Sequence, residues 1–340
     1  RLNSKLDGDP SDPSRFATLR LENVEISNCV VTGAANGGGA LFNGRGVNVI
    51  ADKCLFANNS SDESASGSSK GGGAIGTTGS GGSFLFTNCT FYGNSAALGR
   101  GGAIYTGMDC KVINCTFTGN RAFNGGGFYG HNAGKMYTLI NTICYNNIDE
   151  NETGDIRRNN GDFTIYNCLA TVVSPALAEN FDSNGNILTT PAMKVFENDA
   201  APELKDNGGN TLTVALHATQ SMAAKAGIAT APAGIDVTIP TVDQRGYTRA
   251  AKPCMGAFEL GGIEPVGIQT ATADAKFNYS VEKGRLVIAE SGECRIFNML
   301  GAKITELTIN GSAPINLESG IYIVRFMNEA GTSVAKVLIP

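Results

Sequence analysis

The chain has 340 residues, enough for two domains, and 44 of them are glycine, whereas only 17% are charged and none is tryptophan. This composition disfavours a helical core of large side chains and favours short strands separated by turns. The net charge is −5 and the basic residues are not clustered, which argues against a nucleic-acid partner or an anionic membrane surface, and no apolar stretch is long enough for a transmembrane segment.

Three landmarks recur with one period in the first half of the chain. Asparagines head the first landmark at Asn88, Asn114, Asn141 and Asn167, which lie 26, 27 and 26 residues apart, and Asn28 heads an earlier copy. Glycine clusters ("GGGALF", "GGGAIG", "GGAIY", "GGGFYG") form the second landmark, and runs ending in asparagine ("LFANN", "FYGN", "FTGN", "ICYNN") form the third. Each copy holds about three short alternating runs, which predicts one coil of a parallel solenoid with three short strands.

In such a coil, equivalent residues of successive turns stack about 4.8 Å apart into columns. Asparagine tolerates the left-handed corner between two strands, and its amide can bond to the asparagines above and below. We therefore expect a structural ladder at the corner. Its members are Asn28, Asn88, Asn114, Asn141 and Asn167.

Cysteines follow the corner asparagine in most copies, and we expect them to point inward. The column comprises Cys29, Cys54, Cys89, Cys115 and Cys168, with Thr142 in the remaining copy. A buried free cysteine packs as a small hydrophobic residue, which suits a stacked column. Disulfides or a line of metal ligands are the alternative, because stacked Cα atoms are close enough to bridge. Cys110, Cys254 and Cys294 stand outside the column, and no CxxC pair is present.

Two further segments of the repeat region have structural interpretations. The periodic glycines allow sharp corners and close backbone approach, and they lack the strand, GxxxxGK[ST] and helix context of a phosphate-binding loop. The polar, low-complexity residues 60–71 predict an excursion from the coil. An exposed end coil would be an adhesive edge, so we also expect an N-terminal cap, within residues 1–19 or beyond them.

These repeats resemble a right-handed parallel β-helix of the pectin-lyase-like type over roughly residues 20–172. The paired "GGAI" and "FxxN" landmarks are also similar to the repeats of polymorphic outer-membrane proteins and bacterial surface β-helix proteins. The resemblance implies a secreted or surface protein. Residues 1–262 are therefore assigned to the β-helix, with an irregular closing segment over about residues 175–262.

Residues 206–228 and 243–260 resemble the closing segment of bacterial choice-of-anchor Q domain proteins. "DQRGYTRAAKPCMGAFEL" carries the matching residues, which include the charged cap residues Asp243, Arg245, Arg249 and Glu259. These charges could be catalytic, but an acid and two arginines in a cap more often form ion pairs that tie a loop to the last coil. His217, in the same segment, is expected to pack.

From about residue 275, apolar and polar residues alternate, which predicts a small antiparallel β-sandwich over residues 263–340. The pattern from "RIFNMLGAKI" through "INLESGIYIVRF" to "AKVLI" resembles the type A C-terminal sorting domain of the type IX secretion system. The usual early "PNP" is replaced by "NYSVEKG". The resemblance implies secretion or attachment at the outer surface of a Gram-negative bacterium.

Lyases and hydrolases of this fold bind polysaccharide in a groove beside one sheet, but the paired-aspartate signals "NTD", "DD" and "GHG" are absent. The residues next to the glycine-led strand are the candidate ligand-binding set. Its tyrosines could stack on sugar rings, and its basic groups could contact acidic sugars. The alternative is that these residues form a solvated face without a ligand. The set comprises Tyr105, Asp109, Tyr129, His131, Asn132, Lys135, Asp155, Arg157 and Arg158.

Two functions of different class follow. The favoured one is a non-catalytic adhesin or glycan-binding structural module, monomeric and without a cofactor, whose partner is a glycan or a host or cell-surface ligand. The alternative is a polysaccharide lyase or glycosidase, in which calcium would serve only the lyase. Grouping of Asp109, Lys135, Asp155 and Arg157 in one groove would favour the enzyme, and dispersal would favour display.

Overall fold

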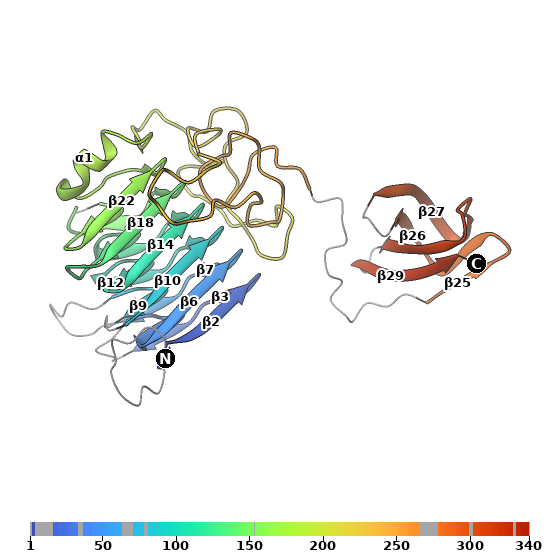
Figure 1. Cartoon of the computed structure of the whole chain (residues 1–340), viewed down its shortest axis with the longest axis horizontal. Coiled ribbons are helices and arrows are strands. Elements are labelled where there is room, and N and C mark those ends of the chain that lie inside the picture. The colour runs from blue at the N-terminus through green and yellow to red at the C-terminus, as the bar shows by residue number, and fades with distance from the viewer. Residues whose placement is uncertain are drawn as a thin grey trace. The chain divides into compact units, whose positions relative to one another are not determined.

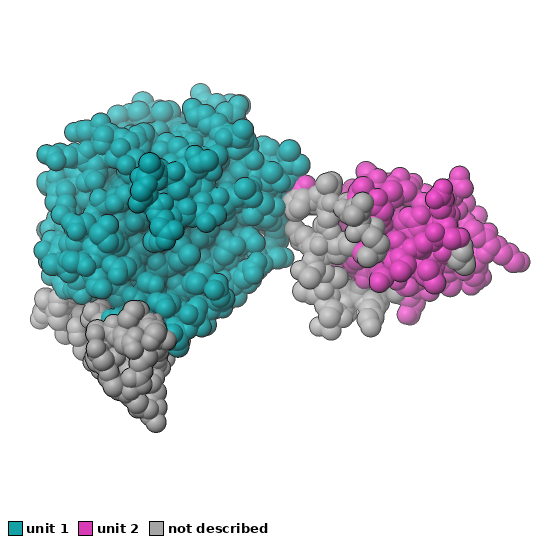
Figure 2. Space-filling model, viewed as in Figure 1, with its two compact units in different colours: residues 1–263 teal, residues 264–340 magenta. Residues whose placement is uncertain are grey.

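The computed structural model describes residues 2–3, 16–32, 37–62, 71–77, 81–152, 154–264, 278–298, 302–328 and 331–339. The chain forms two compact units, residues 1–263 and 264–340 (Figure 2). The predicted excursion falls mostly on residues 63–70, and much of the expected N-terminal cap falls on residues 4–15; both lie outside the described residues.

Unit 1 is built from stacked parallel strands (Figure 1). Sheet A contains β1 (Leu2–Asn3), β5 (Leu41–Arg45), β9 (Ile75–Thr77), β13 (Ile104–Thr106), β17 (Phe128–Gly130) and β21 (Ile156–Arg158). Sheet B contains β2 (Ala17–Glu22), β6 (Val47–Asp52), β10 (Gly82–Thr87), β14 (Asp109–Ile113), β18 (Met136–Ile140) and β22 (Asp162–Tyr166). Sheet C contains β3 (Glu25–Ser27), β7 (Leu55–Ala57), β11 (Thr90–Tyr92), β15 (Thr116–Thr118), β19 (Ile143–Tyr145), β23 (Leu169–Ala170) and β24 (Ile187–Leu188).

These three sheets confirm the predicted all-β solenoid with three strands per coil. A further short run follows the third landmark and forms sheet D, which contains β4 (Val30–Thr32), β8 (Ser60–Asp62), β12 (Ser95–Arg100), β16 (Arg121–Asn124) and β20 (Ile148–Asp149). Residues one period apart are direct neighbours, as in the pairing of Phe91 with Phe56 on one side and Phe117 on the other.

The interior is filled by columns of identical or similar side chains. The rings of Phe56, Phe91 and Phe117 stack with centroid separations of 4.9 and 4.5 Å. Beside them, Cys89 and Cys115 are fully buried, and the Cys89 N–H points at the Cys115 sulfur at 3.4 Å. All nine cysteines are free. Offset aromatic stacking stabilises the core in addition to the burial of these rings. Each period of the sequence therefore supplies one layer of the core.

Glycine clusters lie where consecutive coils approach most closely. A Cβ atom at Gly73 would overlap the carbonyl oxygen of Gly102, and one at Gly102 would overlap that of Gly126. Any larger residue would force the coils apart, so these glycines serve the backbone packing of the solenoid.

Corner asparagines adopt the predicted left-handed conformation. The φ angles are 57° at Asn28, 50° at Asn88, 52° at Asn114, 51° at Asn141 and 48° at Asn167. Asn141 donates to the Asn114 amide oxygen at 2.9 Å, but Asn88 donates to Asp52 and Asn167 to the Ala226 carbonyl. The corner therefore bonds partly within its own column, partly to Asp52 at the end of β6 and partly to the closing segment.

A continuous amide ladder runs through the second asparagine of each copy. Asn59 donates to Asn94 at 3.0 Å, Asn94 to Asn120 at 2.9 Å, and Asn120 to Asn147 at 2.8 Å. Asn94 also donates to the Phe56 carbonyl and Asn120 to the Phe91 carbonyl of the preceding coil. Three of these asparagines are fully buried, so the ladder satisfies polar groups that water does not reach.

A short helical turn covers one end of the solenoid. The 3₁₀ helix η2 (Pro175–Leu177) leads into α1 (Ala178–Phe181), which lies beside β22 (Figure 1). Leu177 and Phe181 join the core cluster of the coils. This apolar lid removes the open end that a parallel stack would otherwise expose at its last coil.

The charged cap residues were expected to tie the closing segment to the last coil, but the segment lies along the side of the coils (Figure 1). Val195, Leu216 and Met255 share a core cluster with Ile143 and Leu169 of sheet C. Farther along, Ile239 packs on Ile113 and Ile140 of sheet B. The physical reason is that these two sheets carry apolar residues on their outer faces, which the segment buries.

Unit 2 is antiparallel, as predicted. Its strands are β25 (Tyr279–Glu282), β26 (Arg285–Phe297), β27 (Lys303–Pro314), β28 (Gly320–Asn328) and β29 (Gly331–Ile339). They form one sheet in which the long β26 pairs with β27 along its length and with β25 and β28 in turn. A register shift between Ile288 and Ser291 lets β26 bend, and a single core including Cys294 lies inside the curled sheet.

Candidate functional site

The two candidate tyrosines lie in one column of sheet A. Tyr105 pairs with Tyr129, and Tyr129 pairs with Arg157 in the next coil. The Tyr105 and Tyr129 ring centroids are 5.6 Å apart, and the residues are only 4% and 2% exposed. These rings contact each other at an interplanar angle of 31° and present little surface, so the proposed stacking of a sugar on their faces does not fit the geometry.

Basic side chains surround Tyr129. The guanidinium carbon of Arg100 lies 5.4 Å from the Tyr129 ring centroid, and the His131 ring lies 6.2 Å from it and 5.3 Å from Tyr105. Arg100, His131 and Arg157 are each half-buried. We call Arg100, His131 and Arg157, grouped around Tyr129, the basic cluster.

No carboxylate in the described part of the chain pairs with either arginine of this cluster, whereas Arg121, Arg245, Arg249 and Arg295 all form ion pairs. The Nε atom of Arg157 is also buried without a hydrogen-bond partner. Burial, followed by the charge of Arg100, lowers the pKa of His131. Burial raises the pKa of Tyr129, and the charges of Arg100 and Arg157 oppose that rise. Arg100 and Arg157 therefore give the cluster a local excess of positive charge, whereas the lowered pKa of His131 favours its neutral form.

Arg100 was not among the candidates from sequence. It ends β12 in sheet D, directly before Gly101, whose φ of 67° turns the chain toward sheet A. The signal was its place at the head of "RGGAIY", next to the strand that holds Tyr105.

Asp109, Asn132 and Lys135 stabilise the turn between β17 and β18. Lys135 Nζ lies 3.5 Å from Asp109 Oδ2, and the Met136 N–H donates to Asp109 Oδ1 at 2.8 Å. Asn132 donates to the Gly107 carbonyl at 2.9 Å. Arg158, the remaining basic candidate, pairs with Asp162 at 3.9 Å. Asp109, Asn132 and Lys135 therefore have partners in the neighbouring coil, and Arg158 has its partner within its own coil.

Asp155 terminates the inner asparagine ladder. One carboxylate oxygen accepts from the Asn147 amide at 2.9 Å, and the other accepts from the backbone N–H groups of Thr171 at 2.7 Å and Val172 at 3.1 Å. Burial raises the pKa of this carboxyl to about 6, against the opposing effect of these donors. Asp155 therefore has the geometry of a structural group at the end of the ladder. It does not form a common site with the Asp109–Lys135 pair.

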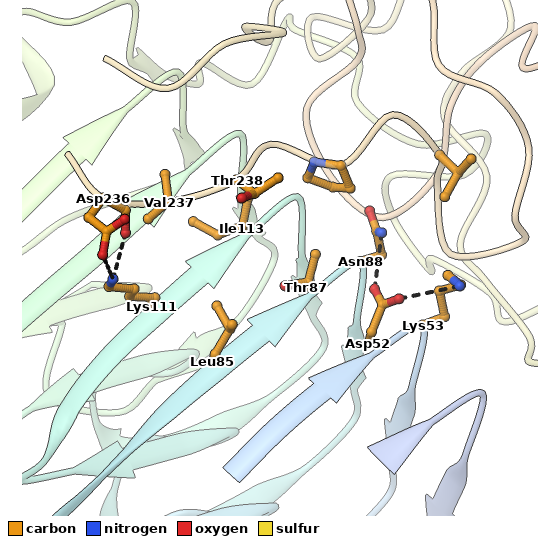
Figure 3. Close-up of a pocket in the computed structure, with 12 residues that line it drawn as sticks. Asp52, Lys53, Leu85, Thr87, Asn88, Lys111, Ile113, Asp236, Val237 and Thr238 are labelled. Atoms are coloured by element: carbon orange, nitrogen blue, oxygen red, sulfur yellow. Dashed lines mark hydrogen bonds and ion pairs between the residues drawn. The ribbon is translucent and has the colours of Figure 1, made fainter. Parts of the chain in front are cut away.

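A separate cavity of about 390 Å³ lies between the outer face of sheet B and the closing segment (Figure 3). Leu85, Thr87 and Ile113 form its floor, and Val237 and Thr238 lie opposite. At its ends, Lys111 donates to the Asp236 carbonyl at 2.6 Å, and Lys53 lies 3.3 Å from Asp52. Its charges are thus already paired. Sequence reasoning missed this cavity because residues 52–113 and 236–242 meet only in the folded chain.

The charged residues of the closing segment form a buried network. Arg245 pairs with Asp243 at 2.7 Å, and Arg249 pairs with Glu259 at 3.2 Å. Arg249 also donates to Asn88 at 3.0 Å, a corner residue in the middle of the solenoid. The network ties the segment to the side of the coils. His217 accepts from the backbone N–H of Gln220 at 3.2 Å, within a turn of its own segment.

Within the described residues, no three His, Cys, Asp or Glu side chains gather closely enough to hold a metal ion. The described helices are also too short and too polar to span a bilayer.

Residues 88–107 match the family described as Chlamydia polymorphic membrane protein (Chlamydia_PMP) repeat. The match covers most of one coil, from the corner Asn88 through the glycine cluster to Gly107. No significant match was found among curated proteins or among solved structures. The repeat and the parallel solenoid together fit a β-helix surface protein of adhesin-like type.

Proposed function

We propose that this chain is a non-catalytic, adhesin-like module that is secreted or held at the outer surface of a Gram-negative bacterium. Its solenoid binds a glycan or another cell-surface ligand through its lateral face, and it needs no cofactor. The observation that supports this proposal best is the surface-protein repeat embedded in a parallel solenoid.

The dispersal of the candidate catalytic residues supports display over catalysis. Asp109 and Lys135 pair with each other, Asp155 ends the inner ladder, and Arg157 belongs to the basic cluster. Acid–base catalysis requires its groups within hydrogen-bonding reach of one substrate atom.

The construction of the solenoid suits a display role. Stacked rings, the amide ladder and the closing segment hold the coils rigidly, so a ligand would meet a surface that is already organised. Unit 2, whose sequence resembles a sorting domain, would serve export or attachment.

Binding of the purified 340-residue chain to a glycan array and to intact cells tests the function. Saturable binding to at least one glycan or cell type is the expected result. Absence of binding in both assays would overturn the ligand-binding role and leave only a scaffold.

The alternative, a polysaccharide lyase or glycosidase, is tested on the same preparation. Uronic-acid and neutral polysaccharides are incubated with the chain, with and without calcium. New reducing ends or ultraviolet-absorbing unsaturated products would contradict the non-catalytic proposal, and polymers that stay intact would support it.

A further inference from the structure

The basic cluster on sheet A lacks the carboxylate partners that neutralise Arg121, Arg245 and Arg249. The chain carries a net charge of −5, yet Arg100 and Arg157 form no ion pair with any described carboxylate. The guanidinium carbon of Arg100 lies 5.4 Å from the Tyr129 ring centroid, and Arg157 pairs with Tyr129 in the next coil, so the two positive charges lie on either side of one tyrosine.

A second observation is the buried Nε atom of Arg157, which has no hydrogen-bond partner. A guanidinium presents its N–H donors in a planar fork that suits carboxylate and sulfate oxygens. Because Arg100 and Arg157 are half-buried, an anionic oxygen placed beside them would accept from guanidinium N–H donors other than the buried Nε and would neutralise the excess charge.

We propose that the basic cluster, formed by Arg100, His131 and Arg157 around Tyr129, binds the carboxylate or sulfate groups of an acidic glycan. This inference rests on the proposed function and names the ligand class and the site. The buried tyrosines act as the rigid support of the cations, since Tyr129 lies under Arg100 and beside Arg157 in the register of sheet A.

The neighbouring polar groups suit hydroxyls beside the anionic group. Exposed Asn159 places its amide nitrogen 3.5 Å from His131 Nδ1 and 3.3 Å from the His131 carbonyl oxygen. The arginines come from β12 and β21 and the histidine follows β17, so the cluster spans successive coils. A linear sugar chain lying along the stacking direction would meet each of them.

The cavity beside the closing segment does not compete for this role. Lys111 is bonded to Asp236, and Lys53 lies 3.2 Å from Glu22 and 3.3 Å from Asp52. An acidic ligand there would have to displace carboxylates that are already in place.

Isothermal titration calorimetry of the full chain with three probes tests the site: oligogalacturonate for carboxylate, a chondroitin sulfate oligomer for sulfate, and a neutral dextran oligomer. The wild-type chain should bind at least one acidic probe more tightly than dextran, and added salt should weaken that binding. Arg100→Gln and Arg157→Gln should each weaken it by about tenfold or more.

Arg121→Gln is the matched control, because Arg121 lies on sheet D and pairs with Glu150 at 2.6 Å. It should change the affinity less than about twofold. If a glutamine variant fails to fold, the corresponding Arg→Lys variant keeps the charge but loses the fork, and its affinity should still fall.

Two results would overturn the inference: acidic probes that bind no better than dextran, or undiminished binding in folded variants of both Arg100 and Arg157. In either case a ligand found on the glycan array or on cells would leave the proposed function intact. If the chain binds none of the calorimetric probes, no glycan of the array and no cell type, both proposals are overturned.

Discussion

The guanidinium of Arg249 donates to the amide oxygen of Asn88 at 3.0 Å and so joins residues 161 positions apart. Asn88 is a solenoid corner with φ of 50°, whereas Arg249 belongs to the closing segment and is paired with Glu259. The corner column therefore has two structural roles. It changes the direction of the chain between two strands, and it anchors the closing segment that covers sheets B and C.

Removing Arg249 should loosen the closing segment. In Arg249→Gln, the Glu259 carboxylate would remain buried without its cation, because both side chains are nearly inaccessible. We expect the free energy of unfolding to fall by about 3–5 kcal/mol, measured by denaturant unfolding, and proteolysis within residues 189–263 to accelerate.

The control for this prediction is Arg295→Gln, which breaks an exposed pair with Glu306 in unit 2. That variant should leave proteolysis of residues 189–263 unchanged. Equal protection of the segment in wild type and Arg249→Gln would show that apolar packing alone holds it.

The inner asparagine ladder should be sensitive to a single truncation. Asn120→Ala removes the acceptor used by the Asn94 amide and backbone N–H, at 2.9 and 3.0 Å, in a fully buried position. Because the orphaned groups cannot reach water, we expect a loss of roughly 3 kcal/mol or more in thermal or denaturant unfolding.

Asn159→Ala serves as the comparison for that truncation, since Asn159 is exposed. Its cost should stay below about 0.5 kcal/mol. A similar loss of stability in both variants would show that the buried ladder contributes no more to stability than an exposed asparagine does.

The raised pKa of Asp155 predicts that the free energy of unfolding falls as the pH rises. Its pKa is raised from 3.8 to about 6 in the folded chain, so the folded state holds a proton that the unfolded state has released between these values. The contribution is full below pH 3.8 and is lost as the pH passes 6. By linkage, Asp155 should lower the free energy of unfolding by about 2 kcal/mol between roughly pH 4.5 and 7.

The measurement compares wild type with Asp155→Asn at both pH values. The variant should be less stable throughout, because an amide has one acceptor oxygen and cannot accept both from Asn147 on one side and from Thr171 and Val172 on the other. Its pH slope should nevertheless be smaller by that amount. An unchanged slope would assign the pH dependence to other groups.

Thiol reactivity tests the cysteine column. Cys29 is half-buried and the other eight cysteines are buried. Burial raises the pKa of Cys168 to about 12 and that of Cys89 well above its usual range, so the reactive thiolate is scarce. An aromatic disulfide reagent should label at most one thiol rapidly in the native chain and all nine after denaturation. Fewer than nine in denaturant without reductant would reveal a disulfide.

Periodicity in the sequence determined the solenoid and much of its interior. Corners at Asn114 and Asn141, the inward Cys115 and the stacked Phe91 and Phe117 all follow from one 26- or 27-residue period, because parallel stacking converts a repeat directly into contacts. The antiparallel strands of unit 2 could be predicted for a similar reason, because alternating apolar and polar residues indicate a strand with one buried face.

Only the tertiary structure decided which polar residues meet. Periodicity does not say whether Asn88 bonds within its column or to Arg249, nor that Asp155 ends the inner ladder, because non-repeated segments supply these partners. The basic cluster has the same origin: Arg100, His131 and Arg157 hold different places in their coils, and the winding of the chain brings them around Tyr129. A repeat specifies the layers, whereas charges and hydrogen bonds between unlike segments depend on where each segment comes to lie.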